Sequence, residues 1–241
     1  MDPAYARAYR ELFERHWWWR SRERVVLAAL AAEAPAGGFG EVLDIGCGDA
    51  LMREALRPYG RILGLEPDAS LVSPQRVERG EVVIAPFDAR FDPDRRFGLI
   101  VMLDVLEHLD DAPAALRHVH QLLCPGGILL ITVPAWRVLW TRHDLLNHHR
   151  TRYTRAHLRA VLEEAGLRVD TLRYFFHWLV PLKLMVRLVE WLVPGPARPA
   201  RVPHPLLNRL FLALSKVEQQ TWGQLPWPCG SSLLAVCRRC V

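Results

Sequence analysis

The residues with the most specific chemical meaning lie in the stretch VLDIGCGDALM, residues 42–52. A short apolar run ends in the acid Asp44, and a turn containing Gly46 and Gly48 follows it. A glycine turn between a strand and a helix lets a nucleotide approach the backbone closely. The turn matches only part of the dinucleotide pattern G-x-G-x-x-G, because Leu51 stands where the third glycine belongs.

The acids of this turn limit which nucleotide can bind there. Asp44 lies two residues before Gly46, and Asp49 directly follows Gly48. Carboxylates at both positions would repel a pyrophosphate, whereas they would attract the sulfonium and ammonium groups of S-adenosylmethionine. Glu66, twenty residues after Gly46 at the end of the next expected strand, is well placed to bind two ribose hydroxyls. We therefore expect S-adenosylmethionine as the cofactor and disfavour a nicotinamide oxidoreductase.

The elements that must position these residues follow from the alternation of short apolar segments with amphipathic ones. We expect strands at residues 41–45, 61–65, 81–86, 97–103, 128–133, 167–175 and 232–237. We expect helices at residues 4–33, 50–57, 68–77, 112–123 and 154–166. This order predicts an α/β fold with a doubly wound, largely parallel sheet, whose ligands bind at the carboxyl ends of the strands.

Four successive stretches carry a family resemblance. VLDIGCGDA, ILGLEPD, FGLIVMLDVLEHLDD and LLCPGGILLITVPA resemble the motifs of class I S-adenosylmethionine-dependent methyltransferases of the small-molecule type. The resemblance covers residues 41–134 and continues weakly to the final strand. It implies a Rossmann-like sheet of seven strands whose last strand is antiparallel, and an enzyme that transfers a methyl group from S-adenosylmethionine.

The resemblance also assigns cofactor contacts. They are Asp44, Gly46, Gly48 and Leu103 along the methionine part, Glu66 at the ribose, and Asp88 at the adenine amino group. Two positions depart from the family pattern. Ala50 replaces the usual third glycine of the turn, and Gly98 replaces a common Asp, a change that we expect to be structural.

One domain is expected to hold all of these segments. We divide it into an N-terminal helical lid (1–40), a cofactor-binding core (41–134), a substrate loop, helix and strand (135–176), a helical insertion (177–229) and the last strand (230–241). The run Trp17–Trp19 leaves two interpretations open, a lid over the cofactor or packing against the sheet. Three adjacent Trp side chains cannot all face one core.

The loop 136–153 is expected to bind the methyl acceptor. It contains Trp140, His143, Asp144, His148, His149, Arg150 and Tyr153. Transfer to a hydroxyl or an acidic carbon requires removal of a proton, and histidine is the natural base near neutral pH. His148 and His149 are the candidates, and at most one of them can act, because neighbours in an extended segment point in opposite directions.

Other histidines and acids near the expected site are given simpler roles. A metal site of His143, His148 and His149 with Asp144 matches no compact zinc spacing, so we expect no metal. We interpret His108 as a structural histidine and the pair Asp110–Asp111 as a helix N-cap.

The segment Phe175–Val193 is apolar enough to suggest contact with a membrane. Lys183, Arg187 and Glu190 recur along one helical face, which excludes a membrane-spanning helix but suits an interfacial one. A lid over an apolar pocket, a reversible membrane contact and simple packing on the sheet all remain open. We predict an amphipathic helix near the site opening, with Lys183 and Arg187 facing solvent or lipid headgroups.

The distribution of charge suggests different partners for the two halves. Residues 1–136 hold 15 basic and 20 acidic side chains, a net charge of −5, whereas residues 137–241 hold 16 and 6, a net charge of +10. A basic rear half agrees with an anionic lipid surface, and the absence of a basic run with interleaved aromatics disfavours nucleic acid. The first residues carry no export signal, so we expect a cytoplasmic protein with reduced thiols and, in the lipid interpretation, a peripheral place at the membrane.

We therefore predict a methyltransferase that acts on a small apolar or lipid-like acceptor. The alternative is a non-catalytic protein that retains the fold to bind the cofactor or a partner at the membrane.

Overall fold

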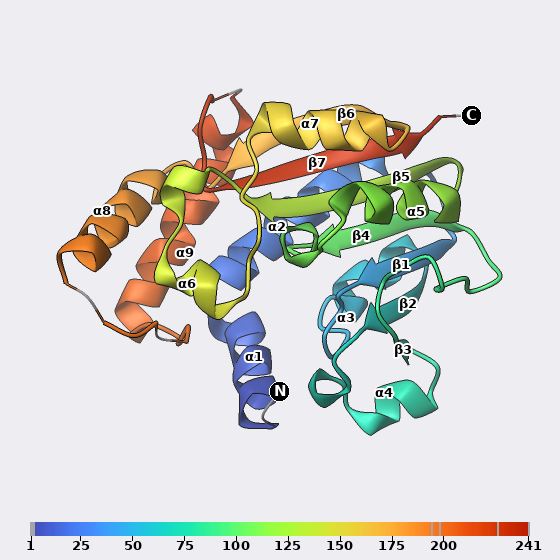
Figure 1. Ribbon diagram of the computed structural model, residues 1–241, viewed down its shortest axis with the longest axis horizontal. Helices are drawn as coiled ribbons and strands as arrows, with labels where there is room; N and C mark the ends of the chain where they lie inside the picture. Colours follow the sequence, from blue (N-terminus) through green and yellow to red (C-terminus); the bar gives the residue numbers. More distant parts are fainter. Residues whose placement is uncertain (1–2, 194, 198, 226, 241) are drawn as a thin grey trace.

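The sheet sets the position of every functional residue. The computed structural model describes residues 3–193, 195–197, 199–225 and 227–240, and in this part of the chain a seven-stranded sheet has the order β3-β2-β1-β4-β5-β7-β6 (Figure 1). The strands are β1 (Glu41–Ile45), β2 (Arg61–Glu66), β3 (Val82–Ile84), β4 (Phe97–Leu103), β5 (Leu123–Pro134), β6 (Leu167–Phe175) and β7 (Ser232–Arg239). Strand β7 runs antiparallel to both β5 and β6, and the other pairs are parallel. The predicted Rossmann-like sheet with an antiparallel last strand is confirmed.

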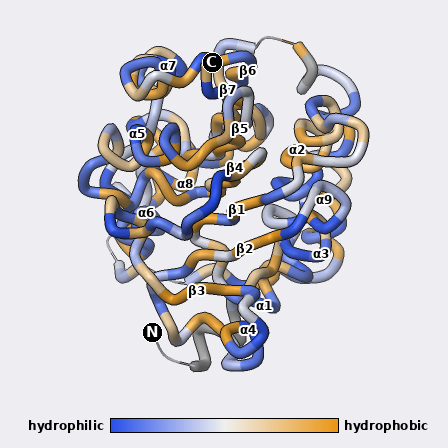
Figure 2. The backbone as a smooth tube through the Cα atoms, turned by 90° about the vertical axis from the view of Figure 1, so that its right-hand side faces the viewer, coloured by the Kyte–Doolittle hydropathy of each residue, from blue (hydrophilic) through white to orange (hydrophobic). Residues whose placement is uncertain are grey.

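Helices cover both faces of this sheet. They are α1 (Pro3–Arg15), α2 (Trp17–Glu33), α3 (Arg53–Leu56), α4 (Pro74–Glu78), α5 (Ala112–Leu122), α6 (Arg142–Leu146), α7 (Arg155–Glu164), α8 (Leu179–Leu192) and α9 (Pro205–Gln220). Apolar side chains of α5 and α7 pack on one face, and those of α2, α3 and α9 pack on the other. Figure 2 shows β1, β2 and β3 as mainly hydrophobic segments inside this layered arrangement. Strand β4 is buried along most of its length, as its unbroken apolar sequence predicts.

Several predicted boundaries change where local hydrogen bonding or a proline intervenes. The helix predicted at residues 4–33 is two helices, because His16 caps α2 by accepting a hydrogen bond from the Trp18 N–H at 3.1 Å. The helix predicted at 68–77 is a 3-10 turn, η2 (Ala69–Leu71), followed by α4, which starts at a proline. Strand β5 begins five residues earlier than predicted, because Leu123 already pairs with Phe97 of β4, and the register shifts before the next pair, Leu99 and Ile128.

The insertion lies at the end of the sheet where the parallel strands finish. Figure 1 places α8 and α9 there, together with α6 and α1. Helix α9 packs on α2, where Asn208 Oδ1 accepts a hydrogen bond from the Trp17 N–H at 2.9 Å. Helix α8 packs on η4 (Arg137–Leu139) and is hydrogen-bonded to Arg142, the first residue of α6. The insertion therefore borders the edge at which the site residues gather.

The orientation predicted for α8 holds only in part, because Arg187 is exposed whereas Lys183 is half-buried, and the charged side chains contact the segment after β5. Arg187 donates to the Val138 carbonyl at 2.7 Å, and Glu190 accepts from the Arg142 N–H at 3.0 Å. Lys183 lies half-buried beside Arg152, and burial together with this positive charge lowers the pKa of Lys183 to about 8. The charged face of α8 thus points at the protein, because the free carbonyls and N–H groups of η4 and α6 offer it partners. Its apolar face is exposed instead.

Within the described residues, no helix has both the length and the apolar character needed to cross a membrane.

Candidate functional site

The glycine turn after β1 has the backbone that its sequence predicts. Gly46 and Gly48 have φ angles of +72° and +54°, in the left-handed region that favours glycine. A Cβ atom on Gly46 would lie 2.5 Å from Val105, so a larger residue would collide there. The buried carboxylate of Glu66 holds the turn from the end of β2, since it accepts hydrogen bonds from the Gly48 N–H at 2.9 Å and the Asp68 N–H at 3.0 Å.

A small cavity of about 20 Å³ opens above this turn. It is lined by Tyr9, Phe13, Arg22, Asp44, Gly46, Cys47, Leu51, Met52 and Leu103. The structure thus brings three predicted cofactor residues, Asp44, Gly46 and Leu103, around one space. Side chains of α1 and α2 cover it, so the N-terminal helices do lie over this site.

Arg22 is a residue of this cavity that sequence reasoning missed. Its buried guanidinium pairs with Asp104, the residue after β4, and stacks over the Trp18 ring with 5.0 Å between the guanidinium carbon and the ring centroid. Burial raises the pKa of Asp44 to about 7, against the opposing effect of Arg22 and with some help from Glu66. The only sequence signal was an arginine one helical turn after Trp18.

The three adjacent tryptophans have different surroundings. Trp17 is buried among Phe176, Trp178 and Phe211, where it joins α2 to the insertion. Trp18 lies under Arg22, next to the cavity. Both side chains thus pack in one hydrophobic cluster, and neither is among the residues that line the cavity, so the lid interpretation of the run stays a prediction.

Asp88 follows β3 on a more exposed surface. It forms an ion pair with Arg90 at 2.6 Å and accepts from the Arg90 N–H at 2.9 Å. These hydrogen bonds lower the pKa of Asp88 to about 2, so the side chain carries a negative charge at neutral pH. It is not among the residues that line the cavity.

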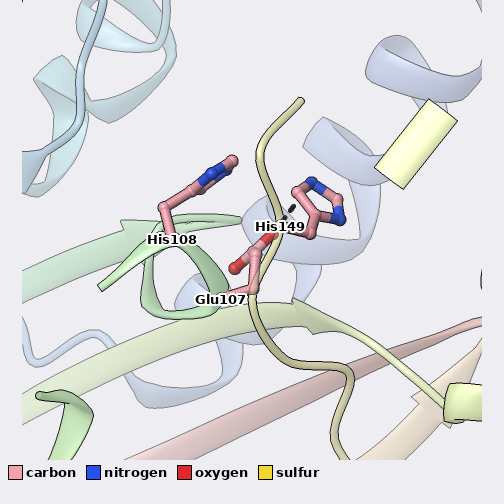
Figure 3. A group of neighbouring side chains, drawn as sticks. All are labelled: Glu107, His108 and His149. Atoms are coloured by element: carbon pink, nitrogen blue, oxygen red, sulfur yellow. Dashed lines mark ion pairs between the residues drawn. The ribbon is translucent and has the colours of Figure 1, made fainter. Parts of the chain in front are cut away.

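A second group of side chains lies just beyond β4, on η3 (Leu106–His108). Figure 3 shows Glu107 and His108 from η3 next to His149, which comes from the loop after α6. The Nε2 atom of His149 lies 4.0 Å from Glu107 Oε1. The rings of His108 and His149 contact each other edge to face, with 4.8 Å between their centroids. Burial, followed by the charge of Asp104, raises the pKa of Glu107 well above its usual value.

The side chain of His149 is fixed by Asp144. Its Nδ1 lies 2.8 Å from Asp144 Oδ1, and Arg152 donates to both oxygens of the same carboxylate at 2.8 and 3.0 Å. Although burial opposes it, these hydrogen bonds lower the pKa of Asp144 and keep it ionised. His149 therefore donates from Nδ1, and the lone pair of its Nε2 faces Glu107 and His108.

The histidines that the sequence grouped together are separated. His148 is exposed, with a φ angle of +57°, and His143 contacts Asn147 at 2.8 Å. Among the residues that the structure describes, the potential metal ligands that come together are Glu107, His108 and His149, whose ligand atoms lie within 4.8 Å of one another. The structural role predicted for His108 did not include its contact with His149, which lies about 40 residues further along the chain. Asp111 is the helix cap predicted, with its side chain accepting from the Ala114 N–H at 2.9 Å.

A larger cavity of about 630 Å³ lies on the outer side of the same loop. It is lined by Arg137, Trp140, Arg150, Thr151, Arg152, His157 and Arg187. This lining holds four arginines and no acid, so the cavity is suited to a ligand that carries negative charge.

The comparison with known families identifies this architecture. The profile of the methyltransferase domain family matches residues 9–172, which include the glycine turn, Glu66 and the η3 group. The chain belongs to this family. The resemblance to class I S-adenosylmethionine-dependent methyltransferases is thereby confirmed, together with S-adenosylmethionine as the cofactor of this methyltransferase class.

Similar proteins carry methyltransferase names. A probable S-adenosylmethionine-dependent methyltransferase of Mycolicibacterium smegmatis is 30% identical over 177 residues, 69% of this chain and 65% of that protein. A ubiquinone biosynthesis O-methyltransferase of Rhodopseudomonas palustris is 32% identical over 97 residues, 37% of this chain and 38% of that protein. The chain thus spans less than two thirds of the length of these relatives.

A solved structure shares the fold over almost the whole chain. It is a methyltransferase in complex with the Trm112 methyltransferase activator of Haloferax volcanii, with a TM-score of 0.63 and 20% identity over 99% of this chain and 97% of that one. At this identity the likeness concerns the fold.

Proposed function

We propose that this methyltransferase transfers the methyl group of S-adenosylmethionine to a hydroxyl oxygen of a lipid-like acceptor at an anionic membrane. In this reaction the acceptor hydroxyl loses its proton, and its oxygen forms a bond to the methyl carbon. The carbon–sulfur bond breaks, and sulfur keeps the electron pair, so that S-adenosylhomocysteine leaves. The protein must align the oxygen with the methyl group and help to remove the proton.

The observation that carries this proposal is the adjacency of a cofactor cavity and a histidine cluster. Leu103 lines the cavity, Asp104 pairs with its lining residue Arg22, and η3 follows shortly after them in the chain. The cofactor would lie on the glycine turn with Asp44 at its ammonium group and Glu66 at its ribose. Arg22 is suited to its carboxylate. The cavity is far smaller than the roughly 300–1,000 Å³ of ligand sites, so we expect α1 to move when the cofactor enters.

His149 is the residue that we place at the acceptor oxygen. Asp144 orients it, whereas the exposed His148 has no comparable support. Transfer to oxygen is favoured because relatives that match the chain over 97 residues are named ubiquinone biosynthesis O-methyltransferases. The arginine-lined cavity beside this loop would bind an acidic group of the acceptor.

The exposed faces of the insertion support an acceptor that is drawn from a membrane. Leu188 and Trp191 on α8 are 55% and 77% exposed, and Leu206 on α9 is 70% exposed. Exposed apolar stripes of this kind mark contact sites, and tryptophan is favoured at lipid–water interfaces. We define the insertion surface by these outward residues: Leu184, Met185, Leu188, Trp191 and Leu192 of α8, and Leu206, Leu207, Leu210 and Leu214 of α9.

The charge around the insertion surface also fits an anionic membrane. Arg201, Arg209 and Lys216 are exposed there. The two acids of the insertion are turned inward, since Glu190 bonds to Arg142 and the buried Glu218 accepts from the Trp178 N–H at 3.1 Å. Apolar contact combined with basic side chains is the usual basis of peripheral binding to anionic lipid.

The catalytic part of the proposal is tested by separating binding from turnover. Calorimetry should detect S-adenosylmethionine binding in the wild type, and His149→Ala should keep that affinity while losing methyl transfer to hydroxyl-bearing lipid extracts. General acid–base assistance is typically worth about 10²–10⁴-fold in rate. His148→Ala is the matched control and should retain both properties. Absence of cofactor binding in the wild type would refute the proposal.

The membrane part is tested by sedimentation with vesicles that contain phosphatidylglycerol. The double variant Leu188→Glu/Trp191→Glu should lose vesicle binding and keep cofactor affinity, because charge cannot enter the apolar layer without a large cost. Val77→Glu on α4 is the control, since Val77 is 44% exposed and α4 lies far from α8 (Figure 1). If both variants sediment with the vesicles as the wild type does, the insertion surface is not the membrane contact. If the wild type binds a protein and not the vesicles, the insertion surface is a binding site for a protein partner.

A further inference from the structure

Glu107 carries a carboxylate that the described residues leave without a hydrogen-bond partner. The residue is 0% exposed, and neither Oε1 nor Oε2 accepts a hydrogen bond from the described part of the chain. Buried polar atoms are nearly always paired, and an unpaired buried carboxylate is especially unfavourable. The arrangement therefore points to a ligand that would approach these oxygens.

Two imidazoles lie next to this carboxylate. His108 is the next residue on η3, and His149 reaches the same point from the loop after α6 (Figure 3). One ligand atom from each of the three residues lies within 4.8 Å of the others. A zinc-sized cation about 2.1 Å from each ligand atom would hold these atoms about 3.4 Å apart. The three ligand atoms would therefore need to move only slightly closer together.

The surroundings of His149 are those of a metal ligand. Its Nδ1–H donates to Asp144, which leaves the Nε2 lone pair directed at Glu107. Asp144 is itself held by Arg152 and by the Thr141 N–H at 2.8 Å. A carboxylate behind a ligating histidine fixes its tautomer and orientation in known metal sites.

We propose that Glu107, His108 and His149 bind a divalent transition-metal cation at the acceptor side of the methyltransferase site. Two imidazoles and one carboxylate suit Zn²⁺, Mn²⁺ or Fe²⁺ and leave coordination positions open. The acceptor hydroxyl would occupy one of them. This inference rests on the proposed function and assigns His149 a specific part in it.

The cation would act as a Lewis acid on the acceptor. Coordination lowers the pKa of a hydroxyl, so its proton passes to solvent at neutral pH. The coordinated oxygen then attacks the methyl carbon while the carbon–sulfur bond breaks. With the cation bound, Nε2 of His149 acts as a ligand in place of a general base, so the activity lost in His149→Ala would come from loss of the cation. The substrate class follows from this, a phenol or related hydroxyl compound that can bind a metal through oxygen.

The test is a titration of the chelator-treated full chain with Mn²⁺, followed by the electron paramagnetic resonance signal of the free ion. Mn²⁺ is chosen because its preference for oxygen and nitrogen avoids the free thiols, such as the exposed Cys240. One ion should bind per chain. Glu107→Gln and His149→Ala should each weaken binding by about 10–100-fold or more, and Asp144→Asn by about 10–100-fold. His148→Ala should bind Mn²⁺ like the wild type.

Thermal unfolding separates a lost ligand from a damaged fold. Without metal, Glu107→Gln should melt at or above the wild-type temperature, because a neutral amide replaces a buried carboxylate of the same size. Mn²⁺ should raise the melting temperature of the wild type and of His148→Ala, and should leave that of Glu107→Gln unchanged. No binding by the wild type, or equal binding by Glu107→Gln, overturns the cation site. Calorimetry with S-adenosylmethionine on the same samples keeps the two proposals apart. Cofactor binding without Mn²⁺ binding would refute the cation site and leave the proposed function standing.

Discussion

At the residue scale, the proposed role of Asp44 predicts that cofactor affinity depends on pH. Its pKa is raised to about 7, first by burial, with Arg22 opposing and Glu66 adding to the shift. In the protein without cofactor it is therefore mostly neutral at pH 5.5, although it would be ionised in an unfolded chain. The cofactor's ammonium group favours the charged form. Affinity should therefore rise with pH through this window.

Calorimetry at pH 5.5 and 7.0 measures this effect. The ionised fraction of a group with a pKa near 7 changes roughly 15-fold between these values, and the affinity of the wild type should change by about the same factor. Asp44→Asn should bind more weakly at pH 7.0 and show a flat profile. The folded protein gains stability as pH falls in the same window, because the folded form of Asp44 binds its proton more tightly than the unfolded form. A flat wild-type profile would remove Asp44 from the cofactor site.

Glu66 should affect the cofactor in two ways. Its carboxylate holds the turn through Gly48 and is expected to bind the ribose hydroxyls. Glu66→Gln changes one acceptor into a donor and should reduce cofactor affinity by about 1.5–3 kcal/mol, roughly 10–150-fold. Calorimetry gives the value, and Glu78→Gln on the exposed side of α4 is the matched control. Unchanged affinity in Glu66→Gln would contradict the assignment.

At the scale of elements, Gly98 shows why β4 departs from the family pattern. A Cβ atom at this position would lie 2.1 Å from the carbonyl oxygen of Phe39, which belongs to the connection between α2 and β1. The close approach of this connection leaves no space for the common Asp. The expectation that the change is structural thus has a direct physical reason.

Gly98→Ala should therefore destabilise the protein. Backbone must shift to relieve the collision, and overpacking of this kind typically costs about 1–3 kcal/mol. Chemical denaturation measures the loss of unfolding free energy, and cofactor affinity should be unchanged in the folded fraction. Full stability in Gly98→Ala would mean that Phe39 can move freely.

Strands and helices are predicted correctly from the sequence where the pattern of apolar and turn residues is local. Strands β4 and β6 match residues 97–103 and 167–175, because apolar runs between turn residues determine them. The partnership of Glu107 with His149 was missed, because it depends on two loops meeting across the sheet edge. The orientation of α8 was predicted only in part, for a related reason. The sequence predicts its charged stripe correctly, but the side that the stripe faces depends on contacts such as that of Arg187 with the Val138 carbonyl of η4.

At the scale of the whole molecule, the insertion helices α8 and α9 lie at one end of the sheet, and strands β1, β2 and β3, which carry the proposed cofactor site, lie away from them (Figure 1). In the sequence, residues 1–136 have a net charge of −5 and residues 137–241 one of +10. The folded insertion increases this contrast by turning Glu190 and Glu218 inward. Attraction to anionic lipid would hold the site opening against the surface that supplies the acceptor.

Neutralising the exposed basic residues should weaken membrane binding without affecting the cofactor. Each basic side chain near an anionic surface contributes about 1 kcal/mol, so Arg201→Gln/Arg209→Gln/Lys216→Gln should reduce vesicle affinity by about 3 kcal/mol, roughly 150-fold. Sedimentation over a salt series is the measurement. Wild-type binding should weaken with salt because screening limits these charges to about 8 Å at physiological ionic strength, and the variant should depend less on salt. The matched control neutralises Arg57, Arg79 and Arg96, which are exposed outside the insertion. If the two triple variants lose affinity equally, net charge rather than the insertion surface directs the protein to the membrane.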